Sequence, residues 1–394
     1  MNKFFRLTGY SLTTSILSYS FNLYLATKLG LEDFGLYTLA VFYASILLQL
    51  ALFGTNELVV RYLHENEGYI HLILKLRFAV MGALGISLLI ATFITDNDIY
   101  LLVLANLLTG FGFPGVFEYL KKQELYAKIF LIQRCLFFCS VVVLFGVTDV
   151  INLRYILFLL FVIDLISNIL QVQFFYRIGF HKSHRLTYSR IITEGKDVLL
   201  FSLAKMSLNA SIRYIIPVKL GLAMLSIFSL SWQFVTFTSL LYTQVTRIFR
   251  PKIYGLHETK QNFDPLIRRY TFALLSIGAC VSIIVYLFGA KVLAILLPNE
   301  EVDYGIYIPF VSASIFLAAF DSLANVLIVM LNKVKFLRNL YFSVAIFVIF
   351  FMIFYDFLFS DLFEFVWTLY LTHVIALALA FIKVFNEIST KTRP

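Results

Sequence analysis

Charged residues are scarce in this sequence. Only 14% of its 394 residues are charged, whereas 60% are hydrophobic and the mean hydropathy is +0.87. A soluble domain contains about 25% charged residues. Long polar stretches are lacking as well. These shortages exclude a soluble enzyme, a membrane-anchored ectodomain and any sizeable catalytic domain outside a membrane.

Metal-ligating and nucleophilic residues are also few. Of the three cysteines, Cys135 and Cys139 lie one helical turn apart and Cys280 is isolated, as small buried hydrophobic residues would be. His181 and His184 belong to a basic loop, where solvated charge is the simpler interpretation. There is no nucleotide-binding loop and no Gly-x-Ser-x-Gly motif. We therefore expect no metal, no cofactor and no enzymatic activity.

Apolar stretches of about twenty residues recur along the whole chain, and each is long enough to cross a membrane as a helix. They do not alternate with period two, and backbone groups in lipid must be hydrogen-bonded within their own segment. The sequence therefore predicts an all-α polytopic membrane protein with about 12 transmembrane helices. The expected spans are 7–29, 34–60, 72–94, 99–118, 129–147, 154–176, 198–219, 224–246, 271–295, 305–330, 339–359 and 365–384.

The positions of the basic residues predict the orientation in the membrane. The N-terminal tail, the loops after even-numbered spans and the C-terminal tail, together with the span ends that adjoin them, hold 26 of the 32 lysines and arginines, whereas the opposite loops are short and acidic. Basic loops stay in the cytoplasm. We therefore expect both termini in the cytoplasm, in a bacterial inner membrane, and we attribute the net charge of +9 to topology rather than to nucleic-acid binding.

The sequence contains a weak internal repeat. The tetrapeptide Lys-Leu-Gly-Leu at 28–31 recurs at 219–222, an offset of 191 residues that agrees with the helix count. The repeat predicts two pseudo-symmetric six-helix lobes, residues 1–176 and 198–394, joined by a cytoplasmic linker at 177–197. Transporters built from two such halves bind their cargo between them and rock one half against the other.

Polar residues form one stripe on the first span and one on the seventh. Spacings of three and four residues place them on a single helix face. The repeat offset aligns Ser18 with Asn209 and Asn22 with Arg213, so both faces are expected to turn toward a shared hydrated cavity. Small packing residues are the alternative interpretation for the first span. The stripes are Thr8, Ser11, Ser15, Ser18 and Asn22, and Ser202, Lys205, Asn209 and Arg213.

Two cations in the seventh span predict an anion site. Insertion of a charged side chain near the centre of a membrane helix costs about 2.5–3.5 kcal/mol, so the positions of Lys205 and Arg213 require an explanation. Their side chains can extend to the nearer interface, or they can bind a phosphate, which matches the planar fork of arginine. Lys28 and Lys219 would extend this basic track to the outer mouth, or each would simply mark an interface.

Acidic residues inside the predicted spans are candidates for ion coupling. Asp164 and Asp321 lie within the sixth and tenth spans. Each is a proton or sodium site in one interpretation, and a buried ion-pair partner of Lys205 or Arg213 in the other. Arg134 and Gln133, near the inner end of the fifth span, are expected to extend toward the interface.

One segment carries a resemblance to a known family. Residues 25–40 read Leu-Ala-Thr-Lys-Leu-Gly-Leu-Glu-Asp-Phe-Gly-Leu-Tyr-Thr-Leu-Ala. This resembles the start of the polysaccharide transporters, the O-antigen flippase-like branch of the multidrug/oligosaccharidyl-lipid/polysaccharide (MOP) exporter superfamily. That family has Leu-Gly-Pro-Glu-x-Phe/Tyr-Gly-x-Tyr after its first helix, and Leu31 replaces the proline here. In the second half the family often has Asp before a basic residue, where this chain has Ile212 before Arg213.

The resemblance implies a MOP/MATE-like transporter fold and a flippase for a polyprenyl-pyrophosphate-linked oligosaccharide. Such a cargo has a dianionic head and a polar glycan that need a polar path, while its tail stays in lipid. In this hypothesis Arg213 and Lys205 bind the pyrophosphate, and Asn209, Asn22 and Ser18 bond phosphate or sugar. Many of the 43 phenylalanines and 23 tyrosines face lipid in our interpretation, although aromatic rings can also stack on sugars.

Two other functions fit parts of the sequence. A cation-coupled drug antiporter of the same superfamily is the first, although its cavity would need acidic rather than basic residues. A membrane glycan polymerase is the second, but the outward loops, of about a dozen residues or fewer, leave little room for its chemistry. The expected partners are the lipid-linked glycan, membrane lipids, a coupling proton or sodium ion, and other glycan-assembly proteins.

Overall fold

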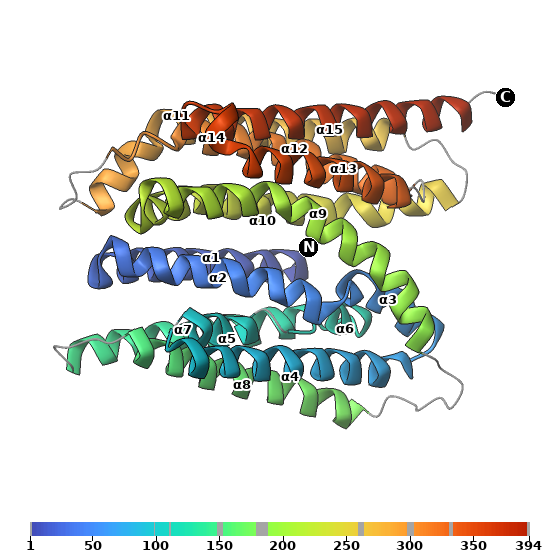
Figure 1. Ribbon diagram of the computed structural model, residues 1–394. Helices are drawn as coiled ribbons and strands as arrows, with labels where there is room; N and C mark the ends of the chain where they lie inside the picture. The colour runs from blue at the N-terminus through green and yellow to red at the C-terminus, as the bar shows by residue number, and fades with distance from the viewer. Residues whose placement is uncertain are drawn as a thin grey trace. The chain divides into compact units, whose positions relative to one another are not determined.

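A computed structural model describes residues 2–97, 99–109, 112–147, 153–178, 188–258, 264–297, 303–330 and 334–391. The regular secondary structure of these residues is entirely helical (Figure 1). The helices are α1 (Asn2–Leu29), α2 (Leu31–Leu52), α3 (Thr55–Glu65), α4 (Tyr69–Thr95), α5 (Ile99–Thr109), α6 (Pro114–Tyr119), α7 (Gln123–Val147), α8 (Leu153–Ile178), α9 (Tyr188–Leu220), α10 (Leu222–Glu258), α11 (Asp264–Leu296), α12 (Ile308–Met330), α13 (Val334–Ile353), α14 (Tyr355–Leu358) and α15 (Leu362–Lys391).

Every predicted span coincides with one helix or with two consecutive ones. Within the described residues, nine helices are long and apolar enough to cross a membrane. These nine do not include α1 and α9, which carry the two predicted polar stripes. The structure is therefore that of an all-α polytopic membrane protein.

Three spans predicted as continuous are in fact interrupted. The span 34–60 breaks between α2 and α3, where Phe53 and Gly54 have φ angles of 49° and 66°. The span 99–118 breaks before α6, because Pro114 disfavours a helical residue ahead of it. The span 339–359 ends as the separate short helix α14.

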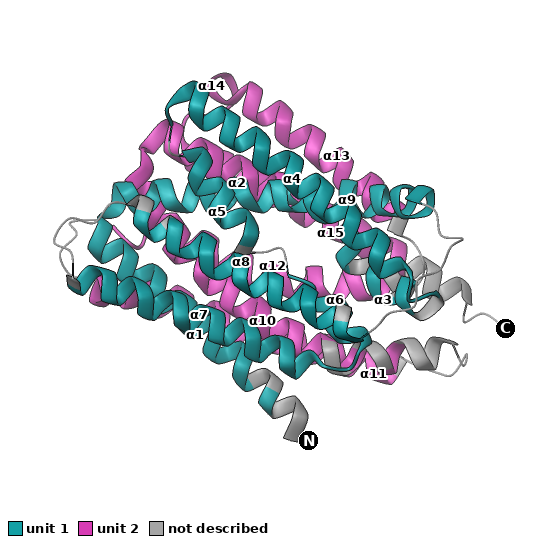
Figure 2. Cartoon of the chain, turned by 90° about the horizontal axis from the view of Figure 1, so that it is seen from below, with its two compact units in different colours: residues 1–206 teal, residues 207–394 magenta. Residues whose placement is uncertain are grey.

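The chain divides into two compact units, residues 1–206 and 207–394 (Figure 2). In the first unit α5 packs against α2, α4 and α8. In the second unit α12 packs against α10, α11 and α15. In the order of the predicted spans, α5 belongs to the fourth and contacts the second, third and sixth, whereas α12 is the tenth and contacts the eighth, ninth and twelfth. Each number in the second unit is six higher than its counterpart in the first, so equivalent spans make equivalent contacts. The two units thus repeat one packing scheme.

The repeated tetrapeptide forms the same corner in both units. Gly30 separates α1 from α2 with a φ of 82°, and Gly221 separates α9 from α10 with a φ of 88°. Each glycine N–H donates to the carbonyl four residues earlier, of Ala26 or Pro217, at 3.2 Å. A left-handed φ favours glycine over residues with a Cβ atom, which explains why this residue occurs in both copies.

The start of α9 packs on the first unit. Residues 188–197, within the predicted linker, are helical, and residues 179–187 lie outside the described part of the chain. The Tyr62 hydroxyl donates to Glu194 at 2.9 Å, and a Cβ atom on Gly195 would lie 2.5 Å from the Phe53 carbonyl oxygen. The close approach of α9 to the α2–α3 break therefore requires glycine at position 195.

Candidate functional site

Helix α9 presents the seventh-span polar stripe from one uninterrupted helix. It continues through Pro217 to Leu220, and the division between the two compact units falls between Met206 and Ser207 within it. At a rise of 1.5 Å per residue, Lys205 and Arg213 are about 12 Å apart along the axis. Lys205 and Arg213 are both half-buried, whereas Asn209 is exposed.

An aromatic ring lies against the arginine of this stripe. The guanidinium carbon of Arg213 is 5.9 Å from the ring centroid of Phe228 on α10. Phe228 is only 1% exposed, so its ring is packed on all sides and lies beside the cation. A cation over an aromatic face gains electrostatic attraction from the ring quadrupole. The contact places the Arg213 guanidinium beside α10 within the second unit.

The first-span residues lie on α1 in the first unit. Ser18 and Asn22 are half-buried, and Lys28 is exposed in the last turn. The hydroxyl of Ser15, a stripe residue, donates to the Ser11 carbonyl of the same helix at 2.9 Å, and the neighbouring Thr14 hydroxyl donates to the Tyr10 carbonyl at 2.8 Å. That bonding fits small packing residues for this part of the stripe. The cavity shared by the two stripes remains a prediction.

Lys219 has a partner within the second unit. Its ammonium group pairs with the Asp356 carboxylate and lies 5.0 Å from the Tyr355 ring centroid. The Lys219 side chain is 34% exposed and that of Asp356 is 81% exposed. An ion pair this accessible contributes little to stability. A role for Lys219 in binding cargo remains a prediction.

Asp164 belongs to a buried polar network in the first unit. It is 1% exposed on α8 and accepts a hydrogen bond from the side-chain amide of Gln133 on α7. The Gln133 carbonyl oxygen in turn accepts from the Ser167 hydroxyl at 3.1 Å. The expectation that Gln133 extends to the interface is wrong, because the side chain is buried and orients the carboxylate.

The same face of α8 bonds to the break between α5 and α6. The Asn168 amide donates to the Leu108 carbonyl at 3.0 Å, and the Gln171 oxygen accepts from the Phe113 N–H at 3.3 Å. These amides therefore satisfy backbone groups that the interrupted helix leaves without an intrahelical partner. The polar face of α8 has a structural role in addition to holding Asp164.

Asp321 is held by two aromatic partners in the second unit. The Tyr341 hydroxyl on α13 donates to one carboxylate oxygen at 2.8 Å, and His373 Nε2 on α15 lies 3.7 Å from the other. The side chains of Asp321 and His373 are 13% and 20% exposed. Sequence analysis missed both partners, although His373 is the only histidine inside a predicted span.

A buried arginine in the first unit was also missed. Arg77 of α4, near one end of the predicted span 72–94, is 1% exposed. It donates to the Thr55 hydroxyl and the Asn56 side chain at 2.7 Å each, and its guanidinium carbon lies 5.1 Å from the Phe113 ring centroid. Arg77 thus joins the α2–α3 break to the α5–α6 break.

Comparison with known proteins yields solved structures only. No protein-family model matches the sequence, and no curated protein matches it. The fold is similar to an outward-facing multidrug resistance MATE family transporter of the MOP superfamily, with a TM-score of 0.67 and 12% identity over 99% of this chain and 96% of that one. A Vibrio cholerae MATE transporter gives a TM-score of 0.63 with 13% identity, over 99% and 97% of the two chains.

A MOP superfamily transporter from Pyrococcus furiosus is also similar. Its TM-score is 0.59 at 12% identity, over 99% of this chain and 96% of that one, and it is described as having a binding pocket of reversed polarity that suggests a different function. The likeness therefore extends over nearly the whole length of each protein. The chain has the two-lobed, all-helical fold of the MATE transporters of the MOP superfamily.

Proposed function

We propose that this protein is a flippase that moves a polyprenyl-pyrophosphate-linked oligosaccharide from the inner to the outer leaflet of a bacterial inner membrane. The oligosaccharide would be an O-antigen or another surface polysaccharide repeat unit. The transporter fold supports alternating access, in which the two lobes open in turn to the two sides. Both termini would be cytoplasmic, as the basic loops indicate.

The observation that carries this proposal is the arginine of α9. Arg213 lies about two turns inside the predicted span 198–219, half-buried, with its guanidinium over the ring of Phe228. A guanidinium at this depth suits an anionic cargo, because its planar fork matches phosphate oxygens. The Pyrococcus furiosus neighbour is described as having a binding pocket of reversed polarity, which supports the idea that the polarity of the pocket varies among proteins of this fold.

Each predicted site residue has a role in this proposal. Arg213 and Lys205 bind the pyrophosphate, about 12 Å apart along α9, so that the anion passes from one to the other during the cycle. Asn209, Asn22 and Ser18 hydrogen-bond to phosphate or sugar. Lys28 and Lys219 attract the head group at the outer mouth. The tail remains in lipid and needs no polar path.

The energy source in this proposal is a coupling cation or the membrane potential. Asp164 and Asp321 are the candidates, one in each unit, and each is an acid whose carboxylate accepts a hydrogen bond from a neighbouring helix. A proton or sodium ion bound at either site would favour one lobe arrangement over the other. These carboxylates are also the observation that favours the second candidate, a cation-coupled drug antiporter.

Complementation of glycan display in a transporter-deleted strain tests the proposal. The unchanged protein should restore surface glycan, and Arg213→Ala should lower display at least tenfold, because a charge-assisted hydrogen bond contributes about 1.5–3 kcal/mol. Arg213→Lys should retain part of the display. Lys291→Ala, which removes an exposed cation from α11, is the matched control and should be neutral.

Two results would reject the flippase. One is full glycan display by Arg213→Ala at an unchanged protein level, which would remove this arginine from the mechanism. The other is drug resistance without glycan display by the unchanged protein, which would establish the antiporter instead.

A further inference from the structure

The polar centre around Asp321 combines side chains from three helices of the second unit. Asp321 lies on α12, Tyr341 on α13 and His373 on α15. The Tyr341 hydroxyl donates to one carboxylate oxygen at 2.8 Å, and the other oxygen lies 3.7 Å from His373 Nε2. The second distance is too long for a hydrogen bond, but the two groups are close enough for a charge interaction. The carboxylate is therefore held on one side and faces the imidazole on the other.

The imidazole has an unused nitrogen. His373 Nε2 is buried, and it has no hydrogen-bond partner among the described residues. Such an atom costs free energy, and a proton shared with Asp321 would supply the missing partner. A proton needs no cavity, unlike any larger occupant. The side chains of Asp321 and His373 are 13% and 20% exposed, so the pair retains a surface at which a proton can exchange.

The donor set of this centre disfavours sodium. Hard metal cations are bound by several oxygen ligands, whereas imidazole nitrogen is a ligand of transition metals. One oxygen of Asp321 already accepts the Tyr341 proton, and the other faces the nitrogen of His373. The centre therefore favours a proton over a sodium ion.

The neighbouring helices bring no other group that titrates near neutral pH to this centre. Helix α12 packs against α10, α11, α13 and α15. Tyrosine, lysine and arginine ordinarily titrate above about pH 9, and only histidine does so between about pH 5 and 8. Besides Asp321 and His373, the described titratable and charged side chains on the facing parts of these helices are Tyr242, Arg268, Arg269, Tyr270, Arg338, Tyr341 and Lys383.

The acid of the first unit has different surroundings. Asp164 is only 1% exposed and accepts from the side-chain amide of Gln133, which bonds in turn to Ser167. An amide does not titrate, so Gln133 positions the carboxylate without sharing a proton with it. Asp321 differs in both respects, because it is more exposed and faces a histidine. Of the two acids, Asp321 is therefore better suited to bind a proton.

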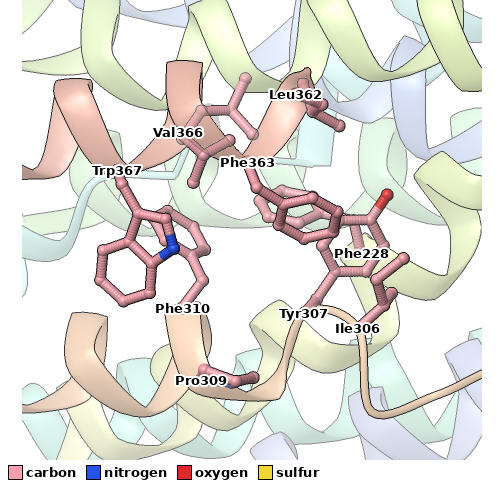
Figure 3. A pocket seen from close by; sticks show the side chains of 10 residues that line it. Phe228, Ile306, Tyr307, Pro309, Phe310, Leu362, Phe363, Val366 and Trp367 are labelled. Carbon is pink, nitrogen blue, oxygen red and sulfur yellow. The ribbon is translucent and has the colours of Figure 1, made fainter. Parts of the chain in front are cut away.

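The centre is also separate from the surroundings of Arg213. Phe228, which lies beside Arg213, lines a small, mostly apolar pocket at the first turns of α12 and α15 (Figure 3). Phe310 of this pocket and Asp321 belong to the same helix and are about 16 Å apart along its axis. A proton at Asp321 therefore does not compete directly with an anion at Arg213, and coupling between them acts through the helices.

We propose that Asp321 and His373 together bind the coupling proton, and that Asp164 has a structural role. Without the proton, the pair carries the single negative charge of Asp321. The proton binds to His373 Nε2, the imidazolium closes on the free carboxylate oxygen, and the pair has no net charge; release of the proton restores the negative charge. A change of net charge inside a membrane span changes the cost of burying it, so it favours one lobe arrangement over the other.

The inference rests on the proposed function for the transport, but proton binding can be measured without cargo. Nuclear magnetic resonance of the full-length protein, labelled with ¹⁵N-histidine and purified in detergent, follows the imidazole directly. The signal that is lost in His373→Asn identifies His373. It should titrate between about pH 5 and 8. Asp321→Asn should weaken its proton binding at least tenfold, because an opposite charge within about 4–6 Å changes proton affinity by about 10- to 1000-fold.

Two further measurements test the choice of ion and the coupling. Replacement of choline chloride by sodium chloride at constant ionic strength should leave the His373 titration unchanged. In the complementing strain, His373→Asn should lower glycan display several-fold at an unchanged melting temperature. His71→Asn, at a half-buried position of α4, is the matched control and should leave display unchanged.

The outcomes separate the proton site from the flippase. A His373 signal that does not titrate, or that titrates identically in Asp321→Asn, would overturn the inference even if complementation succeeds. A titration that sodium displaces to lower pH would assign the centre to sodium instead. Full display by His373→Asn would show that the pair is only structural. An Asp321-dependent titration in a protein that fails complementation would support the proton site and reject only the proposed transport.

Discussion

The guanidinium Nε of Arg77 donates a hydrogen bond to the hydroxyl of Thr55 over 2.7 Å. Thr55 is the first residue of α3, and its hydroxyl in turn donates to the Leu52 carbonyl at the end of α2. A second guanidinium nitrogen reaches the Gly112 carbonyl at 3.5 Å, ahead of α6. A single side chain therefore satisfies polar groups at both helix interruptions of the first unit.

Substitution of Arg77 by methionine should destabilise the first unit. The change leaves Thr55 and Asn56 without the buried donor, which should cost about 3 kcal/mol. Thermal unfolding in detergent measures the loss. Lys75→Met, at an exposed position of the same helix, is the control and should change stability by less than about 0.5 kcal/mol. Equal melting temperatures for the two variants would contradict the role given to Arg77.

Alanine at position 195 should be poorly tolerated. Its Cβ atom would lie 2.5 Å from a backbone oxygen, that of Phe53, which no change of side-chain rotamer can relieve. We expect a loss of about 1–3 kcal/mol, the usual range for overpacking. Gly82→Ala in α4 is the matched control, because no atom lies within 4 Å of its Cβ position. It should be neutral or slightly stabilising. A stable Gly195→Ala protein would show that α9 does not pack tightly on the α2–α3 break.

Asp321→Asn should separate folding from transport. The amide oxygen can still accept from Tyr341, so the melting temperature should stay within about 3 °C of the unchanged protein. The negative charge is lost, so ion-coupled transport should fall at least tenfold if Asp321 binds the coupling cation. Asp303→Asn, at an exposed loop position, is the control. Unchanged transport in a folded Asp321→Asn protein would leave Asp164 as the remaining candidate.

Substitutions in the ion pair of Lys219 and Asp356 test whether Lys219 attracts the cargo. Because both side chains are accessible, alanine at either position should change stability by less than about 1 kcal/mol. If Lys219 attracts the anionic cargo, Lys219→Ala should lower glycan display several-fold, while Asp356→Ala should maintain or raise it. Identical display by the two variants would indicate that Lys219 only pairs with Asp356.

The helices could be predicted from the sequence because membrane spans need only length and apolar composition. All twelve predicted spans coincide with helices. The interruption at Phe53 and Gly54 could not be predicted in this way, because mean hydropathy contains no information on backbone angles. The repeat could be predicted in part. The matching φ angles of Gly30 and Gly221 show that the repeated tetrapeptide forms the same turn between helices in both units.

The sequence identifies which charged residues lie inside the spans, but it does not identify their hydrogen-bond partners. Asp164 and Asp321 are recognisable as acids inside apolar spans. Their partners Gln133 and Tyr341 come from other helices and are brought close only by the packing of α7 on α8 and of α13 beside α12. Arg77 lies near one end of the predicted span 72–94, where an arginine side chain normally reaches water, so its burial was not predicted. Such pairings depend on tertiary contacts, which one sequence without relatives does not reveal.

The corners at Gly30 and Gly221 also concern the origin of the chain. A turn that occurs twice, with the same hydrogen bonds and in the same packing scheme, is the mark of gene duplication and fusion. Because each half is predicted to cross the membrane six times, an even number, both halves have the same orientation, and a linker is sufficient to join them. The two halves differ in detail, and at the position where the second half has Arg213 the first half has Asn22.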